Sequence, residues 1–393
     1  MDDEKNPDSE PATLAELETI ASTRLPQKVW QFYADGADEQ RTTRRNTSVY
    51  DEILLRPRVL RDVRNIDTST TIFGKRYEVP IAVAPSAYQK LAHPNGEIAV
   101  ARACHNVGSN FTLSSNATTS LEDVIHALPP RDVRYPAPWF QLYFVYSRTI
   151  TQRLIERAEK AGYEALVLTV DTVVMGNRLH EHKVPLQLPP ELALANLTTI
   201  KGGGSSKGRL LSLAKTAADA RKVFEEHSDY LVDASLKWNE VIPWLRSHTS
   251  MKLILKGIMT AEDAECALKA GVDAIIVSNH GGRQLDGVPP TLEVLPEIVD
   301  IVRGRIPVLF DGGIRHGSHV FKALALGADL CLIGRSALWG LTYDGQRGVE
   351  AVFHILEREL WRTMSLVGAS SLKQISKSMV GRSKHDGFGV TKL

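Results

Sequence analysis

The chain has 393 residues, of which 43% are hydrophobic and 24% charged, and its formal net charge is +1. This composition is typical of a globular protein with a sizeable core, and the balanced charge predicts neither a nucleic-acid partner nor an anionic membrane surface. The sequence contains no run of about 18 apolar residues, so we do not expect a membrane-spanning helix. A small molecule is therefore the expected partner.

The N-terminal residues 1–12 (MDDEKNPDSEPA) are acidic and polar. We predict that they are disordered, and they lack the features of a signal or transit peptide. Residues 13–36 are predicted to form a short helical extension before the main domain.

Three cysteines, Cys104, Cys266 and Cys331, lie far apart in apolar stretches without metal-type spacing. We expect all three to be buried and reduced, which favours the cytoplasm. The C-terminal Thr-Lys-Leu (391–393) is a weak match to the Ser-Lys-Leu peroxisomal signal, so the peroxisome is the alternative location.

Eight short apolar runs follow one another along the rest of the chain. They are residues 81–84, 110–114, 139–143, 165–171, 252–257, 274–279, 307–312 and 330–334. Nearly continuous apolar runs are typical of parallel strands that helices cover on their outer face. Most runs start about 22 to 33 residues after the previous one, which suits one strand, one helix and two short loops. We therefore predict an α/β fold in which residues 13–393 form a single (β/α)8 TIM barrel.

The spacing is broken once, between the fourth and fifth runs. This gap includes residues 199–212 (TIKGGGSSKGRLLS), which are rich in Gly, Ser and Lys. Long insertions on barrel loops are usually active-site lids or disordered segments. We therefore predict a lid-like insertion over about residues 179–235.

Chemically useful residues recur at the carboxyl ends of all eight runs, where barrel enzymes place their working groups. In chain order these are Pro85, Ser86 and Ala87; Ser114; Gln141 and Tyr143; Thr169 and Asp171; Lys256; Ser278, His280 and Arg283; Asp311, Gly313 and Arg315; and Gly334 and Arg335. Any one of them could serve a loop hydrogen bond alone. Eight clusters at one face indicate an active site.

Two parts of this face have a distinct chemistry. The glycine-rich turns after the last two strands, with Arg315 and Arg335, favour a phosphate site, although tight turns alone could explain the glycines. His280 is the natural proton acceptor near neutral pH, and Asp171 could orient its ring. His180 and His182 lack the i, i+4 spacing of zinc motifs, so no metal is expected.

At this point several motifs resemble one known family, that of the FMN-dependent 2-hydroxy acid oxidases and dehydrogenases, which includes glycolate and lactate oxidases. They are SNHGGRQLDGVPPTLEVLPEI (278–298), DGGIRHGSHVFKALALGAD (311–329), LTVDT (168–172), FQLY (140–143) and APSAYQKLAHPNGE (84–97). The resemblance covers about residues 13–380 and implies an FMN cofactor, oxidation of an L-2-hydroxy acid to the 2-oxo acid, O2 or another electron acceptor, and a homotetramer.

The resemblance also implies roles for individual residues. His280 would be the catalytic base paired with Asp171, and Tyr143 would contact the reacting hydroxyl. Arg178 and Arg283 would hold the substrate carboxylate. The flavin ring would be contacted by Lys256, by Ser114, Gln141, Thr169 and Ser278, and by the backbone of Pro85, Ser86 and Ala87. The phosphate-bearing side chain would be held by Asp311, Gly313, Arg315, Gly334 and Arg335.

Two residues depart from the family pattern. Phe32 stands where the family usually has the first of two tyrosines, whose hydroxyl helps to bind the carboxylate. Asn116 stands where the glycolate oxidase pattern has tryptophan, so the pocket should be wider and more polar. We therefore predict a substrate larger than glycolate.

Three alternatives remain open from the sequence. The same flavin chemistry could act on a hydroxy ester, an amide or another alcohol. A phosphate-binding barrel without flavin could be an aldolase or isomerase that uses Lys256 as a Schiff-base lysine. An inactive barrel could serve as a binding module.

Overall fold

All eight predicted apolar runs form strands of one parallel sheet in the computed structural model, which describes residues 10–130, 132–197, 210–211, 213–383 and 390–392. These strands are β4 (Ile81–Val83), β5 (Thr112–Ser114), β6 (Trp139–Leu142), β7 (Ala165–Thr169), β8 (Lys252–Ile258), β9 (Ala274–Val277), β10 (Val308–Asp311) and β11 (Leu330–Ile333). Their order is β4-β11-β10-β9-β8-β7-β6-β5, and a parallel bridge between Val83 and Phe111 joins the two ends. The predicted (β/α)8 TIM barrel is confirmed.

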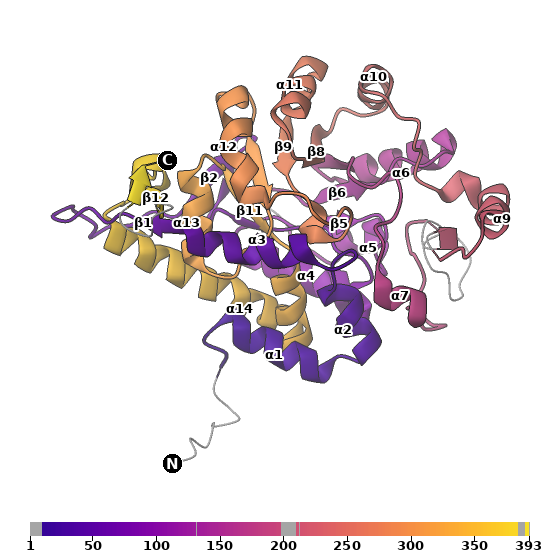
Figure 1. Cartoon of the computed structure of the whole chain (residues 1–393), viewed down its shortest axis with the longest axis horizontal. Helices are drawn as coiled ribbons and strands as arrows, with labels where there is room; N and C mark the ends of the chain where they lie inside the picture. The colour runs from indigo at the N-terminus through magenta and orange to yellow at the C-terminus, as the bar shows by residue number, and fades with distance from the viewer. Residues whose placement is uncertain (1–9, 131, 198–209, 212, 384–389, 393) are drawn as a thin grey trace, which may run out of the picture.

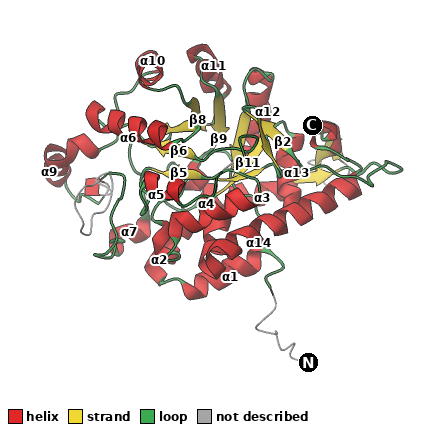
Figure 2. Cartoon of the chain, turned by 180° about the vertical axis from the view of Figure 1, so that it is seen from behind, coloured by secondary structure: helices red, strands yellow, loops and turns green. Residues whose placement is uncertain are grey.

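Helices surround the strands on the outside (Figure 2). They are α4 (Gly96–Asn106), α5 (Leu121–His126), α6 (Arg148–Ala161), α10 (Trp238–His248), α11 (Ala261–Ala270), α12 (Thr291–Val302), α13 (Gly317–Ala325) and α14 (Arg335–Val367). Two of them, α6 and α11, end at Gly162 and Gly271. Both glycines have positive φ (96° and 75°), which glycine adopts without the steric cost that a Cβ brings.

The barrel interior is filled by alternate residues of the strands, since successive side chains of a strand point to opposite faces. One apolar cluster contains Ala82, Ala84, Trp139, Ala165, Val167, Ile254, Ala274, Ile276, Leu309, Leu330 and Leu332. Gln141 lies two residues after Trp139 on its strand, and Lys256 lies two residues after Ile254, both nearer to the carboxyl ends. The alternation that fills the barrel therefore also turns these polar side chains inward above its apolar core.

The opposite end of the barrel is closed by a hairpin of β2 (Thr70–Ile72) and β3 (Lys75–Tyr77). Ile72 and Tyr77 belong to the same buried apolar cluster as the interior residues. A ligand can therefore enter only at the other end of the barrel, where the carboxyl ends of the strands carry polar side chains.

Three helices precede the barrel: α1 (Leu14–Arg24), α2 (Gln27–Ala34) and α3 (Arg41–Glu52). The first two confirm the predicted helical extension, whereas α3 was not predicted. Helix α1 lies along the long α14 (Figure 1). After α3, strand β1 (Ile53–Leu55) forms a small antiparallel sheet with β12 (Val380–Ser383) and β13 (Val390–Lys392).

The insertion after β7 contains α7 (Leu179–Lys183) and α9 (Ala217–His227) within its described part. Residues 1–9, 198–209, 212 and 393 lie outside the described residues. The predictions of a disordered N-terminus, of a lid-like insertion over about residues 179–235 and of a C-terminal peroxisomal signal therefore stay predictions.

Two further observations bear on the cysteines and on membranes. Cys104 and Cys331 are buried as predicted, but Cys266 on the outer helix α11 is only half-buried, and all three are free thiols. Within the described ranges, no helix is both long and apolar enough to cross a bilayer.

Candidate active site

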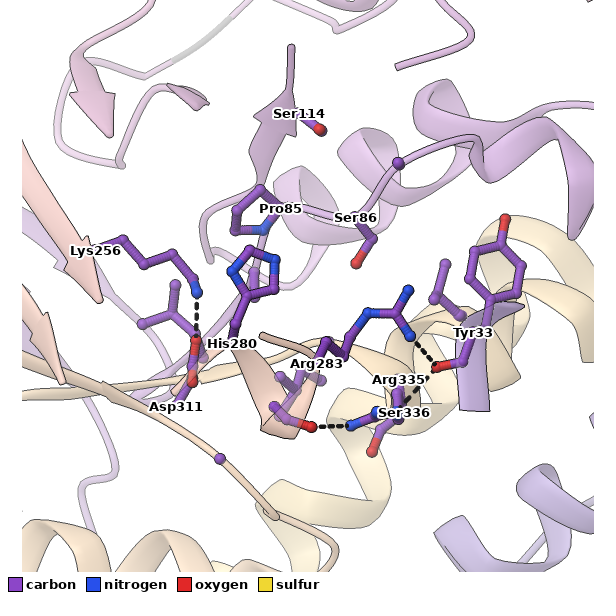
Figure 3. Close-up of a pocket in the computed structure, with 18 of the residues that line it drawn as sticks. Tyr33, Pro85, Ser86, Ser114, Lys256, His280, Arg283, Asp311, Arg335 and Ser336 are labelled. Carbon is purple, nitrogen blue, oxygen red and sulfur yellow. Dashed lines mark hydrogen bonds and ion pairs between the residues drawn. The ribbon is translucent and has the colours of Figure 1, made fainter. Parts of the chain in front are cut away.

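A cavity opens at the carboxyl ends of the barrel strands, and most of the predicted site residues line it. Those that line it are Phe32, Pro85, Ser86, Ala87, Ser114, Asn116, Gln141, Tyr143, Thr169, Arg178, Lys256, His280, Arg283, Asp311, Gly313, Arg315, Gly334 and Arg335. The other two predicted residues, Asp171 and Ser278, lie behind the lining and contact His280 and Lys256. Figure 3 shows that side chains from distant segments of the chain converge on this space.

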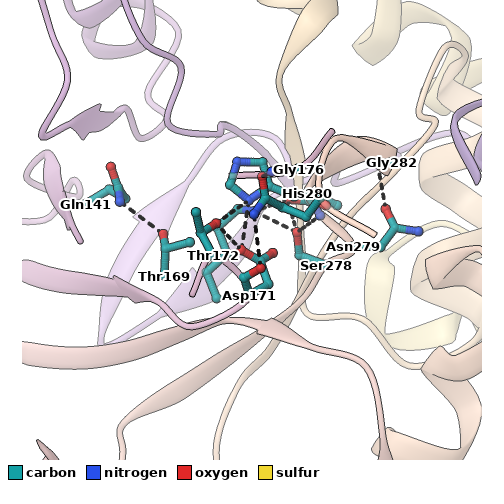
Figure 4. Close-up of polar contacts among 12 residues, drawn as sticks. Gln141, Thr169, Asp171, Thr172, Gly176, Ser278, Asn279, His280 and Gly282 are labelled. Atoms are coloured by element: carbon teal, nitrogen blue, oxygen red, sulfur yellow. Dashed lines mark hydrogen bonds and ion pairs between the residues drawn. The ribbon is translucent and has the colours of Figure 1, made fainter. Parts of the chain in front are cut away.

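His280 is held by a carboxylate (Figure 4). Its Nδ1 lies 2.8 Å from Oδ1 of Asp171, and Thr172 donates a hydrogen bond of 2.9 Å to the same oxygen. Because an ionised carboxylate only accepts, Nδ1 carries the proton and the lone pair stays on Nε2. His280 therefore has a basic nitrogen, Nε2, that is available to a substrate.

The protonation states of this pair suit a base. Burial lowers the pKa of His280, and Asp171 only partly opposes that shift. Although burial alone would raise the pKa of Asp171, the charges of His280 and Lys256 and the hydrogen bond from His280 leave it below the usual value. At neutral pH, His280 is neutral and Asp171 is ionised.

A second polar group joins strands β8, β9 and β10. The ammonium of Lys256 donates to Ser278 Oγ at 2.7 Å and lies 3.2 Å from Oδ2 of Asp311, which also accepts from Ser278 at 2.9 Å. Burial opposes the charge, but Asp311 and Asp171 outweigh it and raise the lysine pKa. Lys256 is therefore a buried cation, unlike the neutral amine that Schiff-base formation requires.

A third polar group orients Gln141. Its Oε1 accepts from Ser114 Oγ and from the Ser115 N–H, both at 3.2 Å, and its Nε2 donates to Thr169 at 3.1 Å. These contacts come from three neighbouring strand ends, and among the described residues the second N–H of the amide has no hydrogen-bond acceptor. Gln141 is thus a fixed donor at the cavity wall.

Two cavity arginines contact the carboxyl end of α2. Arg283 donates to the carbonyls of Tyr33 (3.2 Å) and Asp35 (2.8 Å), and Arg335 donates to the same two carbonyls and to that of Gly281. Burial, followed by the positive charge of neighbouring arginines, lowers the pKa of Arg283 well below its usual value. The end of helix α2 offers partial negative charge to this cationic pair.

Arg178 and Phe32 lie on the insertion side of the cavity. Arg178 pairs with Glu181 at 3.4 Å, and its buried Nε has no hydrogen-bond partner among the described residues. The ring of Phe32 is flanked by the guanidinium groups of Arg178 and Arg283, at 5.8 and 5.3 Å from its centre. The neighbouring Tyr33 hydroxyl donates to the Tyr88 carbonyl at 2.7 Å, so it does not replace the hydroxyl that Phe32 lacks.

The glycine-rich end of the cavity fits a phosphate group. Gly334 is the N-cap of α14, no side chain caps that helix, and a Cβ built on Gly334 would meet nothing within 4 Å. Arg315, which pairs with Glu18 at 3.2 Å and donates to Ser336 at 3.3 Å, and Arg335 both line this end. An open helix N-terminus beside two cations is a suitable anion site.

The same cavity fits the remainder of an FMN molecule. Oδ1 of Asp311 is buried and has no hydrogen-bond partner among the residues described, so it can accept from a hydroxyl group. The cation of Lys256, the donor of Gln141 and the phosphate end of the cavity come from separate strands of one barrel.

Part of the cavity wall was not predicted from the sequence: it comes from α3, from the loop after β4 and from the loop after β7. Thr43, Asn46 and Thr47 of α3 line the cavity, as do Tyr88 and Met175. The buried positions of α3 follow a helical spacing, but two of the four, Thr42 and Asn46, are polar. A search for apolar periodicity does not detect such a helix.

The candidate metal-binding residues have other partners. His180 lies 2.5 Å from Asp35, and His182 contacts Asn177 at 2.9 Å. The part of the chain that the structure describes contains no cluster of three His, Cys, Asp or Glu residues suited to a metal ion.

The fold and this cavity indicate a barrel enzyme that can hold a phosphate-bearing cofactor, and comparison with known proteins identifies its family. The family model for FMN-dependent dehydrogenases matches residues 21–382. The chain is 42% identical to 2-hydroxyacid oxidase 1 of Mus musculus over 370 residues (93% of this chain, 95% of that protein) and 44% identical to glycolate oxidase of Spinacia oleracea over 365 residues (93% and 94%). It is 42% identical to L-lactate oxidase of a Nostoc species over 372 residues (95% and 98%).

Solved structures agree with this result. Mandelate oxidase with benzoyl-formic acid matches with a TM-score of 0.80 and 37% identity, covering 93% of this chain and 96% of that one. The chain therefore belongs to the FMN-dependent dehydrogenase family. It is an FMN-dependent oxidoreductase of 2-hydroxy acids, which leaves no place for the flavin-free aldolase or isomerase or for the inactive binding module.

Proposed function

We propose that this enzyme oxidises an L-2-hydroxy acid larger than glycolate to the 2-oxo acid, with His280 as the base. The observation that carries this proposal is the His280–Asp171 pair, at 2.8 Å, in one cavity with the guanidinium groups of Arg178 and Arg283. O2 or another acceptor would then take the electrons.

The carboxylate of the substrate is proposed to bind between Arg178 and Arg283. Both guanidinium groups reach the cavity, and Arg178 keeps a buried N–H without a partner in the described structure. Two cations suit a carboxylate, which accepts several hydrogen bonds in a fixed geometry. This binding orients C2 of the substrate and its hydroxyl towards His280, and such positioning supplies part of the rate.

The proton that leaves the substrate is proposed to pass to Nε2 of His280. Asp171 then stabilises the imidazolium across their hydrogen bond. Tyr143 also lines the cavity, and burial raises its pKa to about 12, so it stays protonated and can donate to the substrate oxygen. Bound FMN supplies the two-electron acceptor for this oxidation.

The cofactor contacts are proposed from the same geometry. Gly313, Gly334, Arg315 and Arg335 would hold the phosphate, and Asp311 would accept from the ribityl chain. The ring would lie against Pro85, Ser86, Ala87, Ser114, Gln141, Thr169, Lys256 and Ser278. The Lys256 cation favours negative charge, which builds up on the ring as it is reduced.

The size of the substrate is inferred from two cavity residues. Phe32 provides no hydroxyl to the carboxylate, and Asn116 provides a small polar side chain at the cavity wall. A small acid that depends on its carboxylate contacts gains least from this pocket. A larger 2-hydroxy acid can compensate through its side chain.

Anaerobic bleaching of the yellow enzyme by glycolate, L-lactate, mandelate and longer 2-hydroxy acids tests this proposal. We expect the larger acids to bleach the flavin at lower concentrations than glycolate does. A preference for glycolate would contradict the proposed substrate size. Bleaching by hydroxy esters or amides, but by no acid, would show that the substrate is not a free carboxylate.

A homotetramer and a cytoplasmic or peroxisomal location remain predictions. Light scattering of the purified protein checks the first. Fluorescence microscopy of a chain tagged at its N-terminus, which leaves Thr-Lys-Leu at the other end, checks the second.

A further inference from the structure

The turn that carries His280 has an unusual backbone conformation. His280, Gly281 and Gly282 have φ values of 58°, 64° and 75°, all in the left-handed region. Glycine tolerates this region, but a histidine does not favour it, because its Cβ approaches the following carbonyl. The ring of His280 can face Asp171 only while the surrounding structure holds this turn.

Helix α3 supplies that support through a pair of carboxamides. Asn46 Nδ2 donates to Asn279 Oδ1, and Asn279 Nδ2 donates to Asn46 Oδ1, each at 2.8 Å. Asn279 also accepts from the Gly282 N–H and donates to the Pro289 carbonyl, both at 3.2 Å. Both asparagines are buried, and these four bonds fix the orientation of the Asn279 amide immediately before His280.

The rest of α3 packs closely against the same turn. A Cβ on Gly282 would lie 2.4 Å from Thr43 Oγ1, so the helix rests directly on the backbone of the turn. Asp286, beyond the turn, accepts the backbone N–H of Thr42 at 2.8 Å. Asn46 also reaches the phosphate end of the cavity, since its carbonyl lies 1.8 Å from where a Cβ on Gly313 would be.

We propose that Asn46 is a positioning residue, whose carboxamide fixes the orientation of His280 by holding Asn279. This inference rests on the proposed role of His280 as the base. The side chain of Asn46 makes its hydrogen bonds with Asn279 and none with His280, so it acts through the turn. The backbone carbonyl of Asn46, which any substitution retains, packs against Gly313, and both polar atoms of the carboxamide pair with Asn279, so we expect FMN binding not to depend on the carboxamide.

The test compares Asn46→Ala with the wild-type holoenzyme in anaerobic stopped-flow bleaching by a 2-hydroxy acid that reduces the wild type. We expect the limiting rate of bleaching to fall about 10- to 100-fold, the range that a misplaced catalytic group produces. The KM for the acid and the Kd for FMN should stay within about twofold, because the Asn46 carboxamide pairs with Asn279 and is not among the proposed contacts to the acid or to FMN. Asn106→Ala, on the exposed surface of α4, is the matched control and should behave as the wild type.

Two further readouts separate positioning from a purely structural role. In Asn46→Ala, the pH below which bleaching slows should be higher than in the wild type. A relaxed turn exposes His280 to water and so raises its pKa, which burial lowers in the wild type, while the charges of Asp171, Lys256 and Arg283 still act on it. The double variant Asn46→Ala/Asn279→Ala should be no slower than Asn279→Ala alone, since both act through one contact. Asn46→Asp, which keeps the size of the side chain but cannot donate to Asn279, should slow bleaching even if Asn46→Ala fails to fold.

Three results would overturn the inference. The first is that Asn46 variants bleach at the wild-type rate. The second is that the rate losses of the two single variants multiply in the double variant. The third is that FMN is lost in proportion to the loss of rate. His280→Gln separates this failure from failure of the proposed function. If His280→Gln is inactive while Asn46→Ala is unimpaired, only the role of Asn46 is wrong; if His280→Gln reduces flavin normally, both are wrong.

Discussion

Asp171→Asn should slow the oxidation and shift its pH dependence in an unusual direction. The substitution keeps the shape of the side chain and an oxygen that can accept from His280 Nδ1, now at 2.8 Å from Asp171. It removes the negative charge that stabilises the imidazolium. Oδ2 of Asp171 has no hydrogen-bond partner in the described part of the chain, so replacing that oxygen by an amide nitrogen breaks no further hydrogen bond.

The expected size follows from this contact. A hydrogen bond to a charged group contributes about 1.5–3 kcal/mol, compared with about 0.5–1.5 kcal/mol between neutral groups. The difference, about 1–1.5 kcal/mol, corresponds to a rate loss of about tenfold. A larger loss, up to about 10,000-fold, would mean that the asparagine also disturbs the tautomer of His280.

The sign of the pH effect follows from the forces on His280. Burial lowers its pKa, while the charge and the hydrogen bond of Asp171 raise it. Without that charge the pKa falls further, and the base stays unprotonated to lower pH. The acid limb of kcat/KM, which reports the free enzyme, should therefore move to lower pH as the plateau falls.

The assay is a pH series of kcat/KM for the wild type and Asp171→Asn with one good substrate. Thr172→Val, which keeps the carboxylate but removes its other donor, is the control and should change the plateau much less. An acid limb that moves to higher pH in Asp171→Asn, or an unchanged plateau, would refute the reasoning.

Three other substitutions test the remaining parts of the site. Phe32→Tyr should lower the KM for glycolate by about tenfold, since it adds a hydrogen bond to a charged group beside Arg178 and Arg283, and an unchanged KM would show that this position does not reach the carboxylate. Gly334→Val should weaken FMN binding by at least about tenfold, because the new side chain enters the open space at the start of α14 that the phosphate is proposed to occupy. The urea midpoint of the apoprotein should stay unchanged. An FMN affinity equal to that of the wild type would show that the phosphate does not bind at Gly334. Lys256→Met should lower the reduction potential of the bound FMN in a dye-linked titration, because a buried cation that favours the reduced ring is lost, and an unchanged potential would place Lys256 away from the ring.

The strands were predictable from the sequence, because parallel strands covered by helices are continuous apolar runs. Strand β8 is an example, since Ile254 and the leucines on either side of it are all buried. The polar strand ends were predictable for the same reason, since Gln141 and Lys256 interrupt those runs at the carboxyl side. The clustering of these residues in one cavity then follows from closing the barrel.

Other features depend on contacts between distant segments and are not visible in a linear pattern. Helix α3 buries Thr42 and Asn46, whose burial is possible because Gly287 and Val288 supply hydrogen-bond partners for Thr42 and Asn279 supplies them for Asn46. Arg335 was predicted as a phosphate ligand, but its contacts with the end of α2 could not be foreseen without knowing that α2 lies across the cavity. Cys266 shows that a residue within an apolar stretch can still lie on the half-buried side of an outer helix.

The most direct test of the central claim is anaerobic bleaching of purified His280→Gln beside the wild type, with the 2-hydroxy acid that reduces the wild type fastest. The variant should be yellow and bind FMN as the wild type does, because His280 is not among the proposed phosphate contacts. It should fail to bleach while the wild type bleaches fully. A variant that bleaches at the wild-type rate would contradict the assignment of His280 as the base.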